Sequence, residues 1–158
     1  MNIERKSPFY SKKWWRKLAY LYIAIIFTVI VIDALGSNAS QAVIRTKSGD
    51  RHIISIEIAD TFASKSKGLS LRPQICDNCG MLFVYKRIQR LNFWMKDTEF
   101  ALDIAFLDEN MKILEIIRNM KPFSEEVVSS SVPAKYALEM PNGYFDKNGI
   151  KVNDRLLF

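Results

Sequence analysis

Along much of the chain, hydrophobic residues recur at every second position within short segments, which is the pattern of β-strands with one buried face. The clearest example is the alternation of Ile54, Ile56 and Ile58 with smaller or polar residues. A run rich in β-branched residues precedes it, and the turn residues Lys47-Ser48-Gly49-Asp50 lie between the two. The pattern therefore predicts a β-hairpin over residues 43–59.

Further short apolar runs lie between turn-forming residues and predict additional strands. They cover residues 81–85, 93–96, 102–107, 112–117, 135–140 and 155–158. Asp108-Glu109-Asn110 joins two of these runs in a second hairpin. Ser124 to Ser131 is polar and is expected to be a loop.

Only short helices are expected. Asp60-Thr61 can cap a helix over residues 62–69. Asn142-Gly143 and Asn148-Gly149 bracket a turn or a one-turn helix. Many short strands with one or two short helices predict a compact, mostly β single domain, either a β-sandwich or a partly closed barrel.

The N-terminal segment has a different pattern, because residues 18–32 contain no charge, no glycine and no proline. The basic residues that precede this run are opposed only by Glu4. A basic and then apolar order is typical of a signal peptide or a membrane anchor, and it directs the rest of the chain across the membrane. We therefore expect an N-terminal hydrophobic helix in an exported or membrane-anchored envelope protein.

The leader has two alternative fates. The length of its apolar run suits a signal peptide, with cleavage after Ala39 or Ala42. Counting Ala34 and Leu35 lengthens the run, so residues 18–35 could instead stay in the inner (cytoplasmic) membrane as an anchor. In both cases residues 1–42 form the leader, and residues 43–158 form a domain in the periplasm or another extracytoplasmic space.

The net charge of +6 at first suggests a nucleic-acid partner. Most of the excess positive charge lies in the leader, and beyond residue 36 the two signs nearly balance. A basic patch on the domain, which nucleic-acid binding requires, is therefore not expected. The partners expected are the membrane, if the leader is uncleaved, and a small ligand or an envelope protein.

Several motifs resemble the family called domain of unknown function 192 (DUF 192). They are Lys67-Gly68-Leu69, Gly80-Met81-Leu82-Phe83, Phe93-Trp94-Met95-Lys96-Asp97-Thr98, Leu102-Asp103-Ile104-Ala105-Phe106, and, nearer the C-terminus, Ala134, Leu138-Glu139, Gly143, Gly149-Ile150-Lys151-Val152 and Asp154. The resemblance covers nearly all of residues 43–158. It implies a compact, mostly β fold, often behind a signal peptide, and it implies no established activity, substrate or cofactor.

The chain departs from the family pattern in two places. Cys76 and Cys79 stand where such proteins usually carry ordinary loop residues, and Asn153 stands where glycine usually precedes the aspartate. Asparagine adopts the left-handed conformation more readily than most residues, so we expect the turn at Asn153 to be kept.

The Phe93–Lys96 segment predicts a binding surface, because alternate side chains of a strand share a face. If Phe93 and Met95 enter the core, then Trp94 and Lys96 line a surface or a cleft. The candidate ligand-binding residues are Trp94, Lys96, the Thr98 hydroxyl and two carboxylates as counter-charges, Asp103 and Glu139. An indole ring beside an ammonium group suits a small anionic or sugar-like ligand. The alternative is structural: Lys96 pairs with an acid while Trp94 packs.

Cys76 and Cys79 form a C-x-x-C motif in the part of the chain that is expected to be oxidised. A local disulfide is favoured, since no βαβ pattern surrounds the motif as in thioredoxins. A thiol–disulfide redox protein that uses these two cysteines is the alternative function. A zinc site would also need His52 and a fourth ligand, so no metal and no cofactor is expected.

A hydrolase of unknown substrate is a second alternative. His52 is the single histidine, and no serine lies in a nucleophile-elbow motif, which disfavours a Ser-His-Asp triad. Asp103 and Glu139 could act as a carboxylate pair if they lie at a suitable separation. The sequence as a whole favours a binding module over an enzyme.

Overall fold

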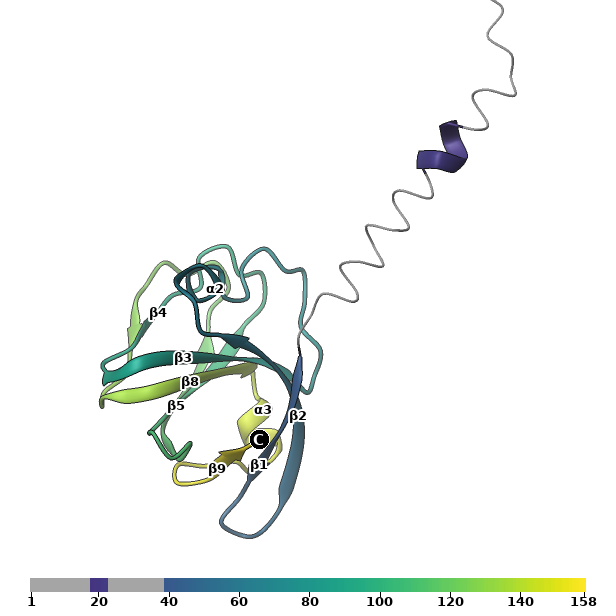
Figure 1. The fold of residues 1–158 in the computed structure, drawn as a ribbon. Helices are drawn as coiled ribbons and strands as arrows, with labels where there is room; N and C mark the ends of the chain where they lie inside the picture. Colours follow the sequence, from purple (N-terminus) through teal and green to yellow (C-terminus); the bar gives the residue numbers. More distant parts are fainter. Residues whose placement is uncertain (1–17, 23–38) are drawn as a thin grey trace, which may run out of the picture. The chain divides into compact units, whose positions relative to one another are not determined.

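The structure is a computed structural model that describes residues 18–22 and 39–158 (Figure 1). Residues 18–22 form a short stretch of exposed helix. Among the described residues, no helix has the length and apolar character needed to cross a membrane. Most of the predicted leader, including residues 23–38, lies outside the described residues, so the hydrophobic helix and its cleavage or insertion stay predictions.

Residues 39–158 fold into nine β-strands and two short helices. The strands are β1 (Ser40–Arg45), β2 (Arg51–Ala59), β3 (Cys79–Gln89), β4 (Asn92–Phe93), β5 (Leu102–Leu107), β6 (Ile113–Met120), β7 (Val128–Ser129), β8 (Ala134–Pro141) and β9 (Arg155–Leu157). The helices are α2 (Phe62–Lys67) and α3 (Tyr144–Lys147). The prediction of a mostly β domain with one or two short helices is therefore confirmed.

Seven strands form one curled sheet in the order β6-β5-β8-β3-β2-β1-β9. Neighbouring strands are antiparallel except β2 and β3, which run parallel. Lys112, just before β6, forms a bridge with Arg155 in β9, and the amide of Leu156 donates to the carbonyl of Met111. These contacts bring the two ends of the sheet together, so the fold is a partly closed barrel. β4 and β7 form a separate two-stranded sheet.

The domain has two hydrophobic cores, one on each face of the strands β3, β8 and β5. The first contains Leu82, Leu138 and Phe145 of α3. The second contains Phe83, which follows Leu82 along β3, and Phe106 of β5. All six residues of β5 are buried as a consequence. This explains why all of residues 102–107 except Asp103 are apolar, rather than every second one.

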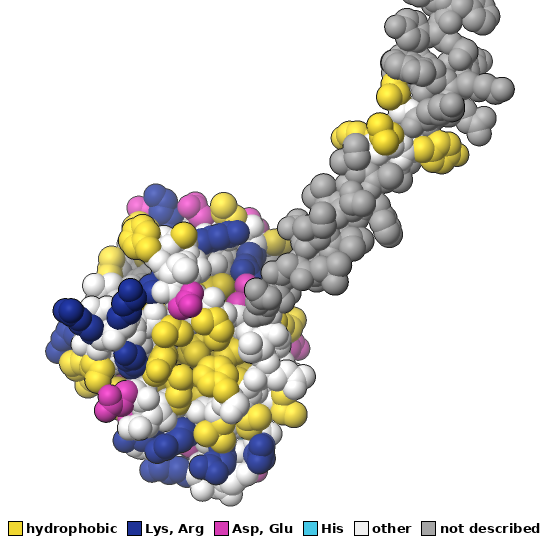
Figure 2. Space-filling view, in the orientation of Figure 1, with side chains coloured by type: hydrophobic (Ala, Val, Ile, Leu, Met, Phe, Trp, Pro, Cys, Tyr) yellow, Lys and Arg dark blue, Asp and Glu magenta, His cyan; other side chains and the backbone are white. Residues whose placement is uncertain are grey.

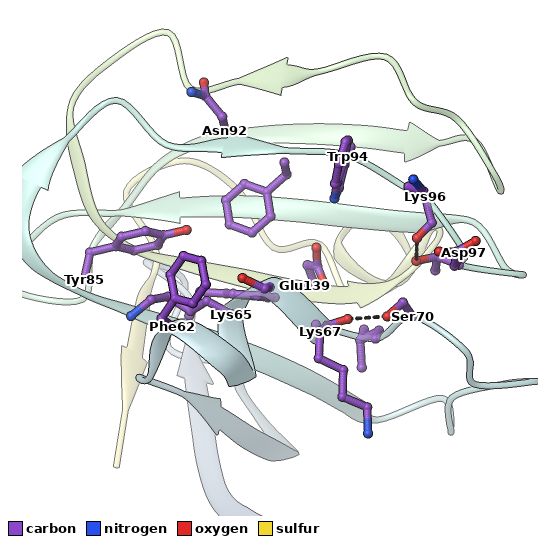
Figure 3. A pocket seen from close by; sticks show the side chains of 16 residues that line it. Phe62, Lys65, Lys67, Ser70, Tyr85, Asn92, Trp94, Lys96, Asp97 and Glu139 are labelled. Carbon is purple, nitrogen blue, oxygen red and sulfur yellow. Dashed lines mark hydrogen bonds between the residues drawn. The ribbon is translucent and has the colours of Figure 1, made fainter.

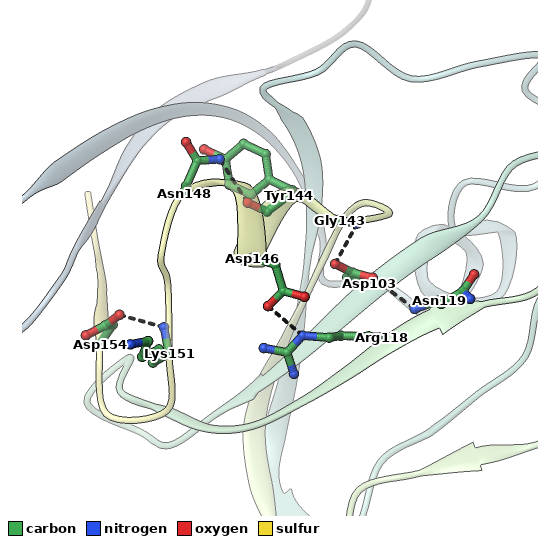
Figure 4. A network of polar contacts seen from close by, with 9 residues as sticks. All are labelled: Asp103, Arg118, Asn119, Gly143, Tyr144, Asp146, Asn148, Lys151 and Asp154. Atoms are coloured by element: carbon green, nitrogen blue, oxygen red, sulfur yellow. Dashed lines mark hydrogen bonds and ion pairs between the residues drawn. The ribbon is translucent and has the colours of Figure 1, made fainter.

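Local sequence signals account for most of the element boundaries. Thr61 and Ser64 form a capping box at the start of α2, in which each side chain accepts from the other's backbone amide. Asn153 adopts a left-handed backbone (φ 78°), as expected for the turn that replaces the usual glycine. Next to it, the carboxylate of Asp154 accepts from the amides of Lys47 and Lys151 and joins two turns (Figure 4).

Two short elements differ from the prediction. The strand expected over residues 93–96 is limited to β4, because it pairs only with the two residues of β7. The polar stretch from Ser124 to Ser131 was expected to be a loop but contains β7. Short strands with one partner leave little pattern in the sequence, since few of their residues are fixed by burial.

Candidate functional site

A pocket of about 400 Å³ opens between α2, β3, the segment that includes β4, and β8 (Figure 3). Its lining combines aromatic rings, hydroxyl groups and charged side chains. The lining residues are Phe62, Lys65, Ser66, Lys67, Gly68, Leu69, Ser70, Phe83, Tyr85, Asn92, Phe93, Trp94, Lys96, Asp97, Thr98 and Glu139. Figure 2 shows that apolar side chains also gather on one outer face of the domain, with Lys and Arg side chains around them.

The side chains of residues 93–96 alternate as the sequence predicted, although the strand itself ends at Phe93. Phe93 and Met95 are 8% and 2% exposed, whereas Trp94 is 52% exposed. The Lys96 ammonium nitrogen lies 5.6 Å from the centre of the Trp94 ring. No carboxylate of the described residues forms an ion pair with Lys96. The alternative in which Lys96 pairs with an acid is therefore not what the structure shows.

Thr98 closes the turn that carries these side chains. Its amide donates to the carbonyl of Met95, and its own carbonyl accepts from the amide of Phe123. Within this turn Asp97 has a left-handed backbone (φ 56°), and the Asp97 carbonyl accepts from the amide of Leu71. Three loops are thus held together by backbone hydrogen bonds, which fix the rim of the pocket beside Trp94.

Glu139 provides the deeply buried carboxyl group of the pocket. It lies on β8 between Met81 of β3 and Ile104 of β5, and it is 4% exposed. Burial raises the pKa of Glu139 to about 8, and neither a hydrogen bond nor a nearby cation lowers it. At neutral pH the carboxyl therefore keeps its proton, and it can both donate and accept a hydrogen bond.

Tyr85 and Lys65 line the pocket on the side opposite Trp94. The Lys65 ammonium donates to the carbonyl of Asp60 at 2.6 Å and to that of Val84 at 3.0 Å, and it lies 5.1 Å from the centre of the Tyr85 ring. Its charge is therefore already held by the protein. The Tyr85 hydroxyl points into the pocket (Figure 3), and burial together with Glu139 raises its pKa. The sequence analysis missed both residues, since neither lies in a recognisable motif.

Asp103, the other carboxylate predicted from the sequence, lies away from this pocket. It pairs in register with Met140, one residue beyond Glu139, so the two carboxyl groups point to opposite faces of the sheet. Its oxygens accept from the amides of Asn119 and Gly143, both at 2.9 Å (Figure 4). Asp103 therefore holds the end of β6 and the start of α3 in place. A hydrolase that uses Asp103 and Glu139 as a pair is incompatible with this geometry.

Cys76 and Cys79 are joined by a disulfide, with their Cα atoms 5.0 Å apart. The amide of Cys79 donates to the carbonyl of Cys76, so the bond closes a tight turn at the start of β3. Neither cysteine lines the pocket. No helix begins at Cys76, and the motif lacks the helix N-terminus that lowers the pKa of a thiol in redox proteins. The geometry favours a local bridge.

Replacing both cysteines by serine is expected to leave the fold intact. The ring is small, and the chain-entropy model therefore gives a loss in the free energy of unfolding of about 2 kcal/mol or less. Urea denaturation with and without a reductant measures this loss. A Cys76→Ser/Cys79→Ser protein that fails to fold would show that the bond has a larger role than closing a turn.

The described residues contain no group of three or more His, Cys, Asp or Glu side chains placed to hold a metal ion. His52 lies in β2, and its Nε2 atom is buried without a hydrogen-bond partner. His52 is not among the residues that line the pocket. The chemistry of the site therefore comes from its carboxyl, hydroxyl, indole and ammonium groups.

Comparisons with known proteins agree with the resemblance. The family model DUF192, described as "Uncharacterized ACR", matches residues 43–158. A UPF0127 protein of Thermococcus sibiricus is 29% identical over 106 residues, which is 64% of this chain and 64% of that relative's length. The chain thus spans somewhat less than two thirds of this relative.

Two solved structures share the fold. One, from Sinorhizobium meliloti 1021, is described as a "putative transcription regulator" and has 31% identity and a TM-score of 0.74 over 76% of this chain. The match covers 93% of that chain. The other, from Novosphingobium aromaticivorans, is described as a protein of unknown function, with 30% identity and a TM-score of 0.72 over 76% of this chain and 85% of its own. The chain belongs to the DUF192 family.

Proposed function

We propose that the protein is an exported or membrane-anchored envelope protein whose domain binds a small ligand in the pocket beside Trp94. The observation that carries this proposal is Glu139, a buried carboxyl with no protein partner on the wall of an aromatic pocket. In the part of the chain that the structure describes, the only fully buried polar side-chain atom without a partner is His52 Nε2, so the Glu139 carboxyl still reaches the open space of the pocket. A ligand that enters the pocket can therefore form a hydrogen bond with this carboxyl directly.

The other lining residues indicate the kind of ligand. The rings of Phe62, Tyr85 and Trp94 offer flat apolar area, and Lys96 offers a positive charge at the rim. Cationic ligands are disfavoured, because ammonium groups of the protein already lie over the Tyr85 and Trp94 rings. A small anionic or sugar-like ligand fits these groups best.

Two features support the extracytoplasmic location. The basic cluster followed by the apolar run over residues 18–32 is the order found in export signals and anchors. The Cys76–Cys79 disulfide suits an oxidising compartment. Separating cell contents into cytoplasmic, membrane and periplasmic fractions tests the location. A full-length protein recovered in the cytoplasm with reduced cysteines would contradict it.

Trp94 makes ligand binding directly measurable. It is the single tryptophan of residues 39–158, because Trp14 and Trp15 lie in the leader. We expect small organic acids and sugars that enter the pocket to change the fluorescence of Trp94 in a saturable manner. Substitution Tyr85→Ala should weaken such binding roughly tenfold, since a buried aromatic contact contributes about 1 kcal/mol or more.

Tyr136, a half-buried tyrosine outside the pocket, supplies the matched control. Tyr136→Ala should leave the affinity unchanged, provided that the variant retains the circular dichroism spectrum of the folded domain. Equal loss of affinity in both variants would indicate a general effect on the fold. The absence of any saturable change across acids, sugars and amines would reject ligand binding in this pocket.

A further inference from the structure

We propose that the ligand is a hydroxylated ring of the saccharide type that carries one carboxylate, with the carboxylate bound by Lys96 and a ring oxygen or hydroxyl bound by Glu139. This assignment rests on the proposed function, because it specifies the occupant of the same pocket. It adds that binding takes place with the carboxyl of Glu139 protonated, which makes the affinity depend on pH.

Polar tips inside an otherwise aromatic pocket call for a ligand with hydroxyl groups. The Glu139 carboxyl, the Tyr85 hydroxyl and the indole nitrogen of Trp94 all point into the same space (Figure 3). A purely apolar ligand would cover these groups without giving them hydrogen-bond partners, which weakens its binding. A sugar ring offers an apolar face for the aromatic side chains and hydroxyl groups at its edge, so it satisfies both requirements.

The rim provides a binding site for one negative charge. Lys65 is held by two backbone carbonyls, and Lys67 extends away from the pocket (Figure 3). Lys96 is exposed, lies beside Trp94, and forms no ion pair with a carboxylate of the described residues. One available ammonium group at the edge of a sugar-sized site favours a ring with a single acidic substituent.

The surroundings of Glu139 determine how its proton responds to such a ligand. Among pocket-lining residues, β3 contributes Tyr85, α2 contributes Lys65 and Lys67, and the segment after β4 contributes Lys96 and Asp97. β5 contributes apolar Ile104 at the paired position. None of the three lysines forms an ion pair with Glu139.

An anion that enters the pocket would repel an ionised Glu139, so the bound complex retains the proton. Above the pKa of about 8, each further pH unit removes nine tenths of the protonated form. The affinity for the acidic sugar should therefore fall about tenfold for each pH unit above that value. Below it, the affinity should be nearly constant, as long as the ligand carboxylate is ionised.

The test uses the full chain with Trp14 and Trp15 replaced by phenylalanine, so that the fluorescence comes from Trp94 alone. Glucuronic acid and N-acetylmuramic acid are the acidic probes, glucose and N-acetylglucosamine are the neutral sugars, and benzoate is an acid without hydroxyl groups. At pH 7 we expect an acidic sugar to bind at least tenfold more tightly than the matching neutral sugar and than benzoate. Lys96→Met should remove this preference, whereas Lys147→Met, at an exposed lysine of α3 outside the pocket, should keep it.

A second measurement follows the proton. Between pH 7 and pH 10 the wild-type affinity for the acidic sugar should fall about a hundredfold, while Glu139→Gln should bind with little dependence on pH. Equal affinity for acidic and neutral sugars, unchanged by Lys96→Met, would overturn the assignment of the acidic sugar and leave the proposed function standing. If no compound of any class changes the Trp94 signal, the proposed function fails as well.

Discussion

A Glu139→Gln protein is expected to be more stable than the wild type at alkaline pH, and its stability should vary little between pH 5 and pH 9. The folded protein holds the pKa of Glu139 at about 8, above its ordinary value of 4.5. Between these values the folded state keeps a proton that the unfolded state has lost, so the free energy of unfolding decreases as the pH rises. The total decrease amounts to several kcal/mol, because one pKa unit corresponds to about 1.4 kcal/mol.

Urea denaturation at a series of pH values measures this effect. Glutamine has nearly the same shape as protonated glutamate and does not ionise, so at pH 5 the two proteins should differ by about 1 kcal/mol or less. Glu99→Gln removes an exposed carboxyl and serves as the control. The Glu99→Gln protein should retain the pH dependence of the wild type. A wild type that is equally stable at pH 5 and pH 9 would show that Glu139 titrates normally.

Gly80→Ala is expected to destabilise the domain by roughly 3 kcal/mol or more, the upper range for overpacking a core. Gly80 lies in β3, where it is buried against β8. A Cβ atom at this position would lie 2.5 Å from the carbonyl oxygen of Glu139 and would collide with the sulfur of Met140. The methionine side chain can move, but the strand backbone cannot do so without breaking the pairing of β3 with β8.

Thermal and urea denaturation of the Gly80→Ala domain test this expectation. Gly49→Ala is a suitable control, because a Cβ atom at Gly49 meets no atom within 4 Å although its φ of +101° is unfavourable for alanine. The control should cost about 1–2 kcal/mol from backbone strain alone. A Gly80→Ala domain that is no less stable than the control would mean that β8 can shift to make room, and that the wall carrying Glu139 is not rigid.

The sequence predicts well those strands that are buried and closed by turns. Residues 102–107 were predicted with the bounds of β5, because both faces of this strand are covered and Asp108 begins a turn. The hairpin over residues 43–59 and the cap at Thr61 also follow from local patterns. Such features depend on neighbouring residues, so a single sequence reveals them.

Long-range pairing was not predictable in the same way. The parallel pairing of β2 with β3 joins segments separated by α2 and the disulfide loop, and no local pattern specifies it. For the same reason, the sequence pattern is compatible both with a partly closed barrel and with a sandwich. The barrel is closed by Arg155 pairing with Lys112, two residues that the sequence does not link.

The pocket was predicted in part. Trp94, Lys96, Thr98 and Glu139 all line it, whereas Asp103 does not. Asp103 and Glu139 are both acidic residues within apolar strands, and their patterns look alike. An offset of one position in the register of β5 against β8 separates them: Asp103 faces two backbone amides, while Glu139 faces the pocket. Register is a property of the assembled sheet, so composition and spacing did not distinguish the two.

The pairing of β9 with β1 has a consequence for how the protein is made. β1 is among the first parts of the domain to leave the ribosome, and its outer edge is covered only by residues 155–157 near the end of the chain. The nascent chain therefore cannot complete its barrel until residues 155–157 have been synthesised. Until then the outer edge of β1 presents unpaired backbone amide and carbonyl groups, which are a template for pairing with a strand of another chain.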